Sequence, residues 1–574
     1  MMFKKYPLIF TTIFYSCITV IITYPLIFHM STSIFSLPDW PADGLGVIWH
    51  FWYEKFCYLK HIPSIPISYL NAPYGIDISK GPINSFWLVY AKWVAVFTNE
   101  VFAYNLGIFS SFILAGVGMY LLSFYLLKNE YISFLCGFAY AFSPFHIVHS
   151  LERLGLACIQ WIPLAILYLF KLKEEPHFKN CVLYSLFITL NFYVEPHYGF
   201  FCMVFSGLYL FYLSIKHRTK NLYEIYLFLK TIFVSAVLIF ILMAPIYLKT
   251  LKNILNAPKV STERTLLKFE RPLKDAQQQS AKFLNYVLPW VHHPVLGGMT
   301  KPFLDTPFYG TEPLILEHTI FLGYICIFFL LYAYRRRKLI HSFLKEDQKE
   351  YLSFLFFAFI CSYLFSLPPY LNLGIIKIPF PSLLLHEILP SIRAFSRFGI
   401  FVVLCATLLA GYGIKYFVQF RKRQLIYYIG IFGMMMFEFL PIPPFHNKNI
   451  IIDLPPAYQW ISDQKGDFII AEYPLEYFNK FYQIKHQKKL FNNDFLDTQS
   501  WALQQKLRDL TQKGTVQELA KIGVRYVLID KEQYKNVIGD HGMLRVLPNF
   551  NTILGLRGIQ KFDQHLIYEI SLKP

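Results

Sequence analysis

Two aspartates stand close together in the stretch LPDWPADGLGVIWHFWYEKF, which covers residues 37 to 56. Asp39 and Asp43 directly follow a long hydrophobic segment and lie among Trp and Pro residues. A carboxylate at the edge of a membrane can act as a general base that takes a proton from a hydroxyl. Simpler roles also exist: Asp39 could start a turn beside Pro38, and Asp43 could cap a helix before Gly44. We favour the turn for Asp39 and keep Asp43 as a catalytic candidate.

Two short segments further along the chain, SPFHIVHSLERLG and VEPHYG, carry more ionisable side chains. Such groups are costly to keep at membrane depth, so a cluster of them on one face predicts a site. The two histidines of the first segment are three residues apart and are either metal ligands on one helical face or residues that snorkel to the interface. The acid and the histidine of the second segment flank a proline, where a solvated hairpin is the alternative. The candidates from these segments are His146, His149, Glu152, Arg153, Glu195 and His197.

Two arginines, Arg393 and Arg397, open a late hydrophobic segment in LPSIRAFSRFGIF. Snorkelling to lipid headgroups is one interpretation. A guanidinium group also offers a planar fork of donors, which suits a phosphate better than a lysine does. The pair is therefore a candidate phosphate site.

The composition places these residues in a membrane protein. Hydrophobic residues make up 55% of the chain, charged residues only 16%, and the mean hydropathy is +0.39. The first apolar run has a basic start but no small-residue cleavage site, so we interpret it as an uncleaved span. The net charge of +18 comes from short basic clusters between apolar segments, which indicates membrane topology rather than nucleic-acid binding.

The basic clusters set the expected topology. Loops rich in Lys and Arg are taken as cytoplasmic. An odd number of spans, about 11, then leaves the N-terminus in the cytoplasm and the C-terminus outside. The apolar piece 83–98 would invert every later loop if it crossed, so we predict that it is re-entrant or interfacial. The predicted spans are 7–28, 103–127, 131–147, 156–172, 180–196, 198–215, 225–248, 318–335, 351–368, 396–418 and 424–440.

The pattern predicts two domains. Residues 1–440 form an all-α multi-pass bundle with long outer loops at 29–102 and 249–317. Residues 441–574 form a small extracytoplasmic α/β domain, with strands expected in DFIIAEYP, GVRYVLID and HLIYEIS around a helical pattern at 500–522. No nucleotide-binding or metalloprotease motif is present, and the tail from 441 contains no cysteine.

Several stretches together resemble bacterial membrane glycosyltransferases of the GT-C superfamily. They are TYPLIFHMSTSIF with the acidic loop that follows it, LNAPYGIDI, FSPFHIVHSLERLGLACIQWIPLAILYLFK and IRAFSRFGIFVVLCATLLAGYG. The resemblance implies a GT-C-like bundle in the bacterial cytoplasmic (inner) membrane. It also implies transfer of a sugar, hexosyl or pentosyl, from a polyprenyl-phosphate donor to a glycan, lipid or protein acceptor on the extracytoplasmic face.

The resemblance also assigns roles to residues. The essential first-loop acid of the family falls on Asp43, with Asp39 as second choice, acting as the base of an inverting transfer. The family often has two acids adjacent or one residue apart in this loop, whereas here they stand four apart, which leaves a divalent metal (Mg or Mn) an open question. Donor phosphate would be held by cations on the same face: Arg153, Arg393, Arg397 and His149.

Two other functions remain as alternatives. A transporter or flippase of an anionic lipid or polymer would use the same arginines as a phosphate path, and would show broken spans and repeated halves. A scaffold whose tail binds a partner would leave Asp43 and the arginines without a shared purpose. A measurement of sugar transfer distinguishes an enzyme from both the transporter and the scaffold.

Overall fold

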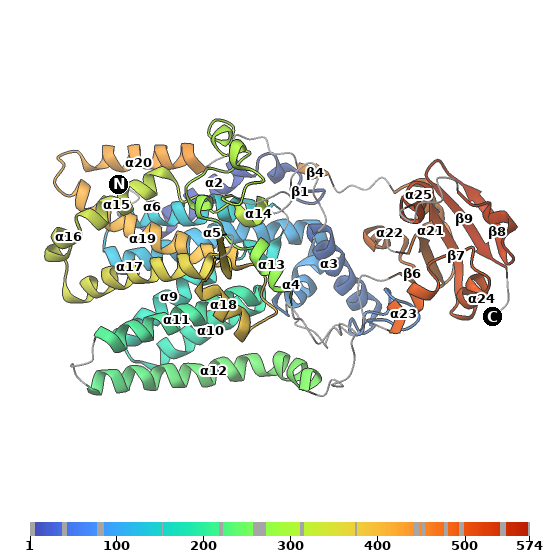
Figure 1. The fold of residues 1–574 in the computed structure, drawn as a ribbon, viewed down its shortest axis with the longest axis horizontal. Helices are drawn as coiled ribbons and strands as arrows, with labels where there is room; N and C mark the ends of the chain where they lie inside the picture. The colour runs from blue at the N-terminus through green and yellow to red at the C-terminus, as the bar shows by residue number, and fades with distance from the viewer. Residues whose placement is uncertain are drawn as a thin grey trace.

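The computed structural model consists of a helical bundle and a C-terminal sheet domain at one end of it (Figure 1). It describes residues 6–36, 43–76, 85–151, 153–216, 222–255, 271–309, 315–373, 376–439, 447–449, 454–475, 480–492, 499–539 and 547–571.

The helices of the bundle follow the predicted spans. Each predicted span coincides with one helix, except the third, which is divided between two helices bent by 43°. By length and composition, five described helices can cross a membrane, or six if the bent pair is one span, so the total of about 11 stays a prediction. The helices are α2 (Pro7–Ile22), α5 (Glu100–Leu127), α6 (Glu130–Ala141) with α7 (Pro144–Ser150), α9 (Trp161–Glu174), α10 (Phe178–Val194), α11 (Pro196–Lys216), α12 (Leu222–Leu255), α15 (Tyr324–Arg335), α17 (Glu346–Ser366), α19 (Gly399–Val418) and α20 (Gln424–Phe439).

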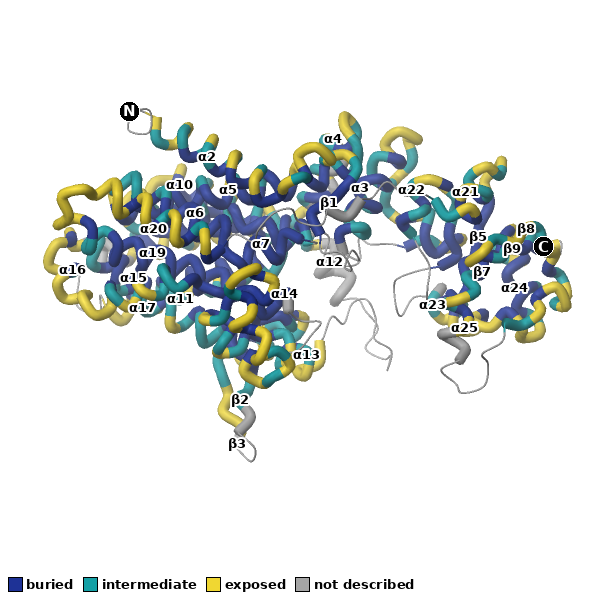
Figure 2. Tube along the Cα trace, turned by 90° about the horizontal axis from the view of Figure 1, so that it is seen from above, coloured by how far each residue is buried: buried dark blue, intermediate teal, exposed yellow. Residues whose placement is uncertain are grey.

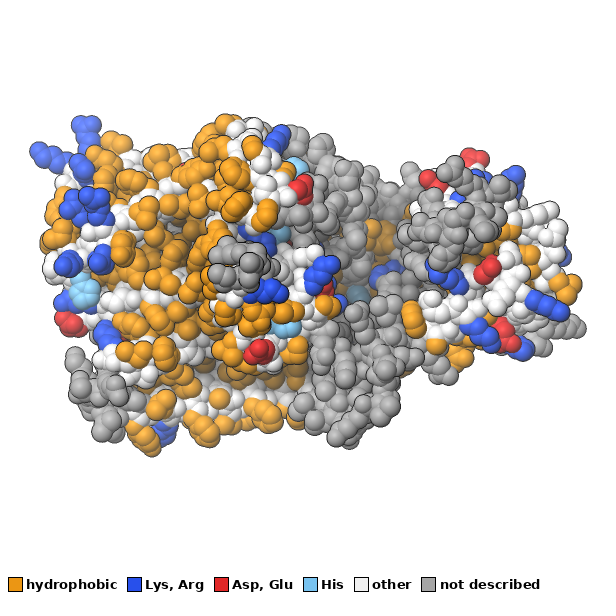
Figure 3. All heavy atoms as spheres, viewed as in Figure 1, with side chains coloured by type: hydrophobic (Ala, Val, Ile, Leu, Met, Phe, Trp, Pro, Cys, Tyr) orange, Lys and Arg blue, Asp and Glu red, His pale blue; other side chains and the backbone are white. Residues whose placement is uncertain are grey.

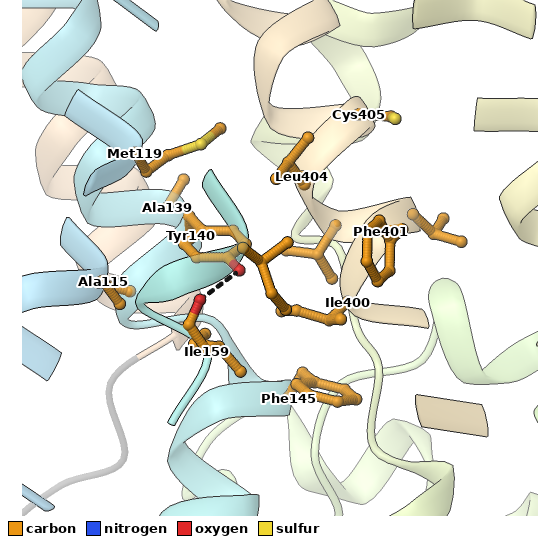
Figure 4. Close-up of a cluster of buried hydrophobic side chains, with 14 of the residues drawn as sticks. Ala115, Met119, Ala139, Tyr140, Phe145, Ile159, Ile400, Phe401, Leu404 and Cys405 are labelled. Atoms are coloured by element: carbon orange, nitrogen blue, oxygen red, sulfur yellow. Dashed lines mark hydrogen bonds between the residues drawn. The ribbon is translucent and has the colours of Figure 1, made fainter. Parts of the chain in front are cut away.

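Helix α19 forms the centre of the bundle, and nearly all of its residues are buried. Its partner α15 comes close because Gly413 has no side chain: a Cβ there would lie 2.3 Å from the carbonyl oxygen of Phe329. On the other side, apolar side chains of α5, α6, α7 and α19 pack together, and the Tyr140 hydroxyl donates to the Ile159 carbonyl at 3.1 Å (Figure 4). This packing fixes α7, which carries two of the candidate histidines.

The piece predicted not to cross the membrane forms helix α4 (Ser85–Phe97). At 1.5 Å per residue its 13 residues span about 20 Å, less than the roughly 30 Å of a hydrocarbon core. It packs against α3 (Asp43–Lys60), and the Phe51 and Trp87 rings lie 6.4 Å apart. Length does not separate it from α15, which has 12 residues and is a predicted span, so the interfacial position of α4 stays a prediction.

The C-terminal domain contains a five-stranded mixed sheet in the order β6-β5-β7-β9-β8. The three predicted strands are confirmed as β5 (Ile469–Tyr473), β7 (Val524–Asp530) and β9 (His565–Ile570). Strands β5, β6 and β7 are parallel, while β9 and β8 are antiparallel to their neighbours. The other elements are β6 (Lys489–Leu490), β8 (Leu556–Lys561), α21 (Pro456–Asp463), α22 (Gln483–His486), α23 (Gln499–Lys506), α24 (Thr515–Lys521) and α25 (Lys531–Gly539).

The first outer loop joins the bundle to this domain, and α3 lies between the two (Figure 2). One face of α3 buries Ile48 and Phe51 in the bundle core, and another buries Trp49 and Trp52 against the C-terminal domain. The chain beyond α3 extends the sheet: the Leu490 amide donates to the Tyr69 carbonyl, and the Ala72 amide donates to the Leu490 carbonyl, both at 2.9 Å. Strand β1 (Ser33–Phe35) pairs with β4 (Asn447–Asn449).

Charge is distributed unevenly along the bundle. Hydrophobic side chains cover much of the visible face, and basic side chains gather at the end that carries α16 (Arg337–Phe343), opposite the C-terminal domain (Figures 1 and 3). The smaller elements lie between the long helices in the sequence: α8 (Leu154–Ala157), α13 (Leu273–Gln278), α14 (Ile315–His318), β2 (Tyr370–Leu373), β3 (Ile376–Pro379), α18 (Pro381–Ile388) and the 3₁₀ helix η6 (Phe395–Phe398).

Candidate functional site

A buried carboxylate, Glu317 on α14, organises the polar cluster of the bundle and is 3% exposed. Arg397 of η6 grips it with two nitrogens: Nη2 lies 2.8 Å and Nε 3.2 Å from Oε1. Arg153, at the start of α8, donates from Nη1 to the same oxygen at 2.8 Å. The Ser396 hydroxyl donates to Oε2 at 3.0 Å. Two of the predicted phosphate ligands are therefore brought together by an acid that we did not select.

His149 completes this cluster from α7. Its Nε2 lies 3.8 Å from Glu317 Oε2, while Nδ1 lies 2.7 Å from the Phe145 carbonyl oxygen. The ring is 1% exposed and stacks on Phe145. Burial alone would raise the pKa of Glu317, but Arg397 and His149 outweigh it and hold the pKa well below its ordinary value. At neutral pH Glu317 is therefore a carboxylate that binds the neighbouring cations.

Glu195 and His197 form a second acid–base pair where α10 ends and α11 begins. His197 Nδ1 lies 2.5 Å from Glu195 Oε1. Burial opposes ionisation of Glu195, yet His197 and the nearby charge of Arg397 keep its pKa below the ordinary value. A Cβ on Gly155 would lie 3.2 Å from Glu195 Oε2, so only glycine leaves this approach open. The positive charge of Arg397 therefore acts on both carboxylates, Glu195 and Glu317.

Helix α4 closes one side of this pair. The indole of Trp87 donates to the Val194 carbonyl at 3.3 Å, one residue before Glu195. An aromatic side chain of α4 therefore lies beside the predicted site.

His146 has a different environment from its neighbour on α7. Its Nδ1 lies 2.6 Å from the Ala141 carbonyl oxygen and its Nε2 lies 2.7 Å from the Ala157 carbonyl oxygen, with the Ser111 hydroxyl at 3.2 Å. It is fully buried. These contacts join α6, α7 and α8, so in this structure His146 holds the backbone that carries His149 and Arg153.

Arg393 differs from Arg153 and Arg397 because it is not bound to Glu317. It is partly exposed and, among the described residues, forms no hydrogen bond or ion pair. Burial and the charges of Arg271 and Arg397 lower its pKa, although Asp275 and Glu317 act in the opposite sense. Among the described residues, Arg393 therefore lies in the field of two further arginines, Arg271 and Arg397, and has no acid bound to it, which favours an additional anion here.

The remaining predicted site residues can be placed only in part. Asp39 and Glu152 lie outside the described residues. Asp43 is the first residue of α3, and its side chain is not among those described. Within the described residues, no group of three His, Cys, Asp or Glu side chains could hold a metal ion, and Glu317 is already occupied by arginines. A divalent metal (Mg or Mn) therefore stays an untested prediction, because the side chains of Asp39, Asp43 and Glu152 are not among those described.

Sequence reasoning missed Glu317, although it lies at the end of the loop predicted as 249–317. The signal was an acid immediately before a hydrophobic segment, in ILEHTIFLGYICIFF, on the face that already held two arginines.

Comparison with solved structures identifies the architecture. The structure of AglB from Archaeoglobus fulgidus, an archaeal oligosaccharyltransferase in complex with an inhibitory peptide and a dolichol-phosphate, superposes with a TM-score of 0.53. The alignment covers 100% of this chain and 75% of AglB at 11% identity. The chain has the fold of AglB. The multi-pass helical architecture expected from the sequence therefore agrees with the fold of this oligosaccharyltransferase.

A second solved structure, ArnT from Cupriavidus metallidurans bound to undecaprenyl phosphate, aligns at a TM-score of 0.42 and 9% identity over 97% of both chains. No protein-family model matches the sequence, and no curated protein does. The relation to AglB is therefore one of fold.

Proposed function

We propose that the chain is a membrane glycosyltransferase that moves a sugar from a polyprenyl-phosphate donor to a glycan, lipid or protein acceptor on the extracytoplasmic face. The observation that carries this proposal is Arg393, a guanidinium with no ion-pair partner among the described residues, close to the Glu317 cluster on an AglB fold. AglB was solved with a dolichol-phosphate, which is a lipid phosphate of the proposed kind.

The phosphate of the donor would bind at Arg393, beside the arginines that Glu317 holds. Departure of a lipid phosphate develops negative charge, which fixed cations stabilise without reorganisation. Glu317 keeps Arg397 and Arg153 in place because each bond to it is charge-assisted. In this division of roles, Arg393 contacts the phosphate, and Arg153 and Arg397 supply fixed positive charge beside it.

The base would be Asp43, at the start of α3, taking the proton of the acceptor hydroxyl in an inverting transfer. Its helix packs on α4, which reaches the Glu195 turn through Trp87. This chain of contacts supports a place for Asp43 near the cationic cluster.

The test of the base is Asp43→Asn in the full-length protein, supplied with undecaprenyl-phosphate-linked glucose, mannose and arabinose and with glycan, lipid and protein fractions of the cell envelope as acceptors. We expect release of undecaprenyl phosphate to fall ~10²–10⁴-fold, because the variant loses the base and little volume. Asp39→Asn ranks the two acids, and Asp563→Asn, an exposed site in the C-terminal domain, is the matched control. Full activity of both loop variants would refute this mechanism.

One observation favours the transporter alternative: the bend of 43° between α6 and α7 is a broken helix of the kind transporters use. The broken helix here carries His146 and His149, which are engaged with the backbone and with Glu317. Lipid movement across the bilayer without any donor cleavage would favour that alternative.

A further inference from the structure

The C-terminal domain contains a cavity of ≈ 250 Å³ that none of the roles above uses. It opens where β5 and β7 end: Tyr473 is the last residue of β5 and Asp530 the last of β7. The cavity is lined by Pro455, Tyr458, Glu472, Tyr473, Tyr482, Leu528, Asp530, Gln533, Gln564 and His565.

The position of this cavity is the one that the sheet topology favours for a ligand. Strand β5 has β6 on one side and β7 on the other, and all three are parallel. The chain passes from β5 to β6 and then returns across β5 to reach β7, so its direction of winding reverses between β5 and β7. In open α/β sheets, ligands bind outside the carboxyl ends of the strands at such a reversal.

The polar groups of the cavity are held in place by the fold. Glu472 is 3% exposed, and its Oε2 accepts from the Tyr458 hydroxyl at 3.0 Å. Asp530 uses Oδ1 to cap α25, accepting from the amides of Glu532 and Gln533 at 3.0 Å. Its Oδ2 lies 3.8 Å from His565 Nε2. Carboxylate oxygens therefore line a cavity whose geometry is set before any ligand arrives.

Aromatic rings supply the apolar part of the lining. The Tyr458 ring lies 4.4 Å from the Tyr482 ring and 5.5 Å from the His565 ring, measured between centroids. The Tyr473 hydroxyl is bound to the Leu507 carbonyl at 2.7 Å, outside the set of lining residues, so it does not serve a ligand. Rings beside hydroxyl-binding groups suit a ligand that has both apolar C–H faces and hydroxyls.

The charges of the lining residues determine whether the cavity favours an anionic, cationic or neutral ligand. Among the described residues, two carboxylates line the cavity and no Lys or Arg does. Burial lowers the pKa of His565 despite the opposing effect of Asp530, so this ring supplies no cation at neutral pH. An anion such as a phosphate is disfavoured. At ≈ 250 Å³ the cavity is slightly smaller than ordinary ligand pockets of ~300–1,000 Å³, which fits one ring rather than an extended chain.

We propose that this cavity binds one uncharged sugar ring of the acceptor, which makes the acceptor of the proposed transferase a glycan. Hydroxyls donate to Glu472 and Asp530, the side-chain amides of Gln533 and Gln564 bind further hydroxyls, and a C–H face lies on a tyrosine ring. The statement that the sugar belongs to the acceptor rests on the proposed function. Sugar binding itself does not depend on turnover.

The test is saturation-transfer NMR on the full-length protein in detergent without donor, so it does not depend on catalysis. The probes are the methyl glycosides of glucose, galactose, mannose, N-acetylglucosamine and N-acetylgalactosamine, with methylammonium and inorganic phosphate as charged competitors. We expect at least one glycoside to bind. Gln564→Ala and Gln533→Ala should each weaken it about 2- to 10-fold, because each removes a hydrogen bond.

Gln560→Ala is the matched control, since Gln560 is exposed on β8 and does not line the cavity. Gln564 is also exposed, so its loss should leave the melting temperature unchanged. Binding of no glycoside, binding that both cavity variants leave intact, or displacement of the glycoside by phosphate would overturn the proposal. Displacement by methylammonium alone would reassign the cavity to a cation. Donor cleavage that persists in any of these cases would leave the proposed function standing.

Discussion

Arg393 and Arg397 are four residues apart, yet the structure gives them different surroundings. Arg397 binds Glu317 through two nitrogens, while Arg393 has no such partner among the described residues. Because the donors of Arg397 already bind Glu317, Arg397 supplies a fixed positive charge. Arg393, whose donors have no partner among the described residues, can bind a ligand. The proposed contact with donor phosphate therefore belongs to Arg393.

Replacement of each arginine by lysine tests this division. Arg393→Lys keeps the charge but loses the planar fork, so we expect donor affinity to fall about 10- to 100-fold. Arg397→Lys should also weaken donor use, accompanied by a lower melting temperature because its buried ion pair is disturbed. Arg421→Lys, between α19 and α20, is the control. Unchanged donor affinity in both variants would favour the alternative in which the two arginines extend to lipid headgroups.

Glu317→Gln tests the anchor itself. The amide leaves the buried guanidinium of Arg397 without a counter-charge, which should cost about 3–5 kcal/mol of stability. Thermal unfolding in detergent measures the loss. Glu346→Gln is the matched control, because Glu346 is 87% exposed and its pair with Lys349 should contribute less than about 1 kcal/mol. Equal melting temperatures for the two variants would contradict the anchoring role.

The same pair has a pH signature. The folded-state pKa of Glu317 is depressed, so its stabilisation is complete above the unfolded-state pKa of about 4.3 and is lost as pH falls towards the folded-state pKa. The difference in melting temperature between the native protein and Glu317→Gln should therefore be constant from pH 7 to about pH 5 and shrink below that.

At the scale of elements, α3 is the joint between the bundle and the sheet. Gln483 of α22 fastens it: Oε1 accepts from the Trp49 indole at 3.0 Å, and Nε2 donates to the Tyr69 carbonyl at 2.7 Å. Trp49 and Gln483 are buried, and Tyr69 is half-buried. Since α3 begins at Asp43, the C-terminal domain has a physical means to fix the helix that carries the proposed base.

Gln483→Ala should loosen this joint. It leaves the buried Trp49 N–H without its acceptor, at about 1–3 kcal/mol, and removes one of two bonds to the Tyr69 carbonyl, which still accepts from the Leu490 amide. We expect faster hydrogen exchange across 45–72 and 485–492, together with reduced transfer. Gln459→Ala, on exposed α21, is the control. Unaltered exchange across 45–72 would show that the joint is held by apolar packing alone.

At the scale of the whole molecule, the basic end with α16 and the C-terminal sheet lie at opposite ends of the bundle (Figures 1 and 3). The positive-inside rule then predicts that the sheet is extracytoplasmic. A cysteine introduced at Lys513 should react with an impermeant reagent on intact cells, and one at Lys338 only after permeabilisation. Both positions are exposed, and the unmodified protein with its nine cysteines gives the background. The reverse labelling pattern would invert the topology.

The sequence alone determined what depends on local pattern. Hydropathy located the helices, alternation and apolar runs located β5, β7 and β9, and the polar loops pointed to Arg153, His149 and Arg397 on one face. These inferences hold because helices and strands satisfy their backbone bonds with near neighbours, and because charged groups in a membrane protein are restricted to a few positions.

Only the tertiary structure decided which of these residues meet. Glu317 binds Arg153 and Arg397, which are 164 and 80 residues away in the chain. The Gln483 bond to Tyr69 spans 414 residues, and the cavity between β5 and β7 exists only once the sheet has assembled. No local pattern encodes such pairings, because their energy comes from burying charges and amides together after distant segments have packed.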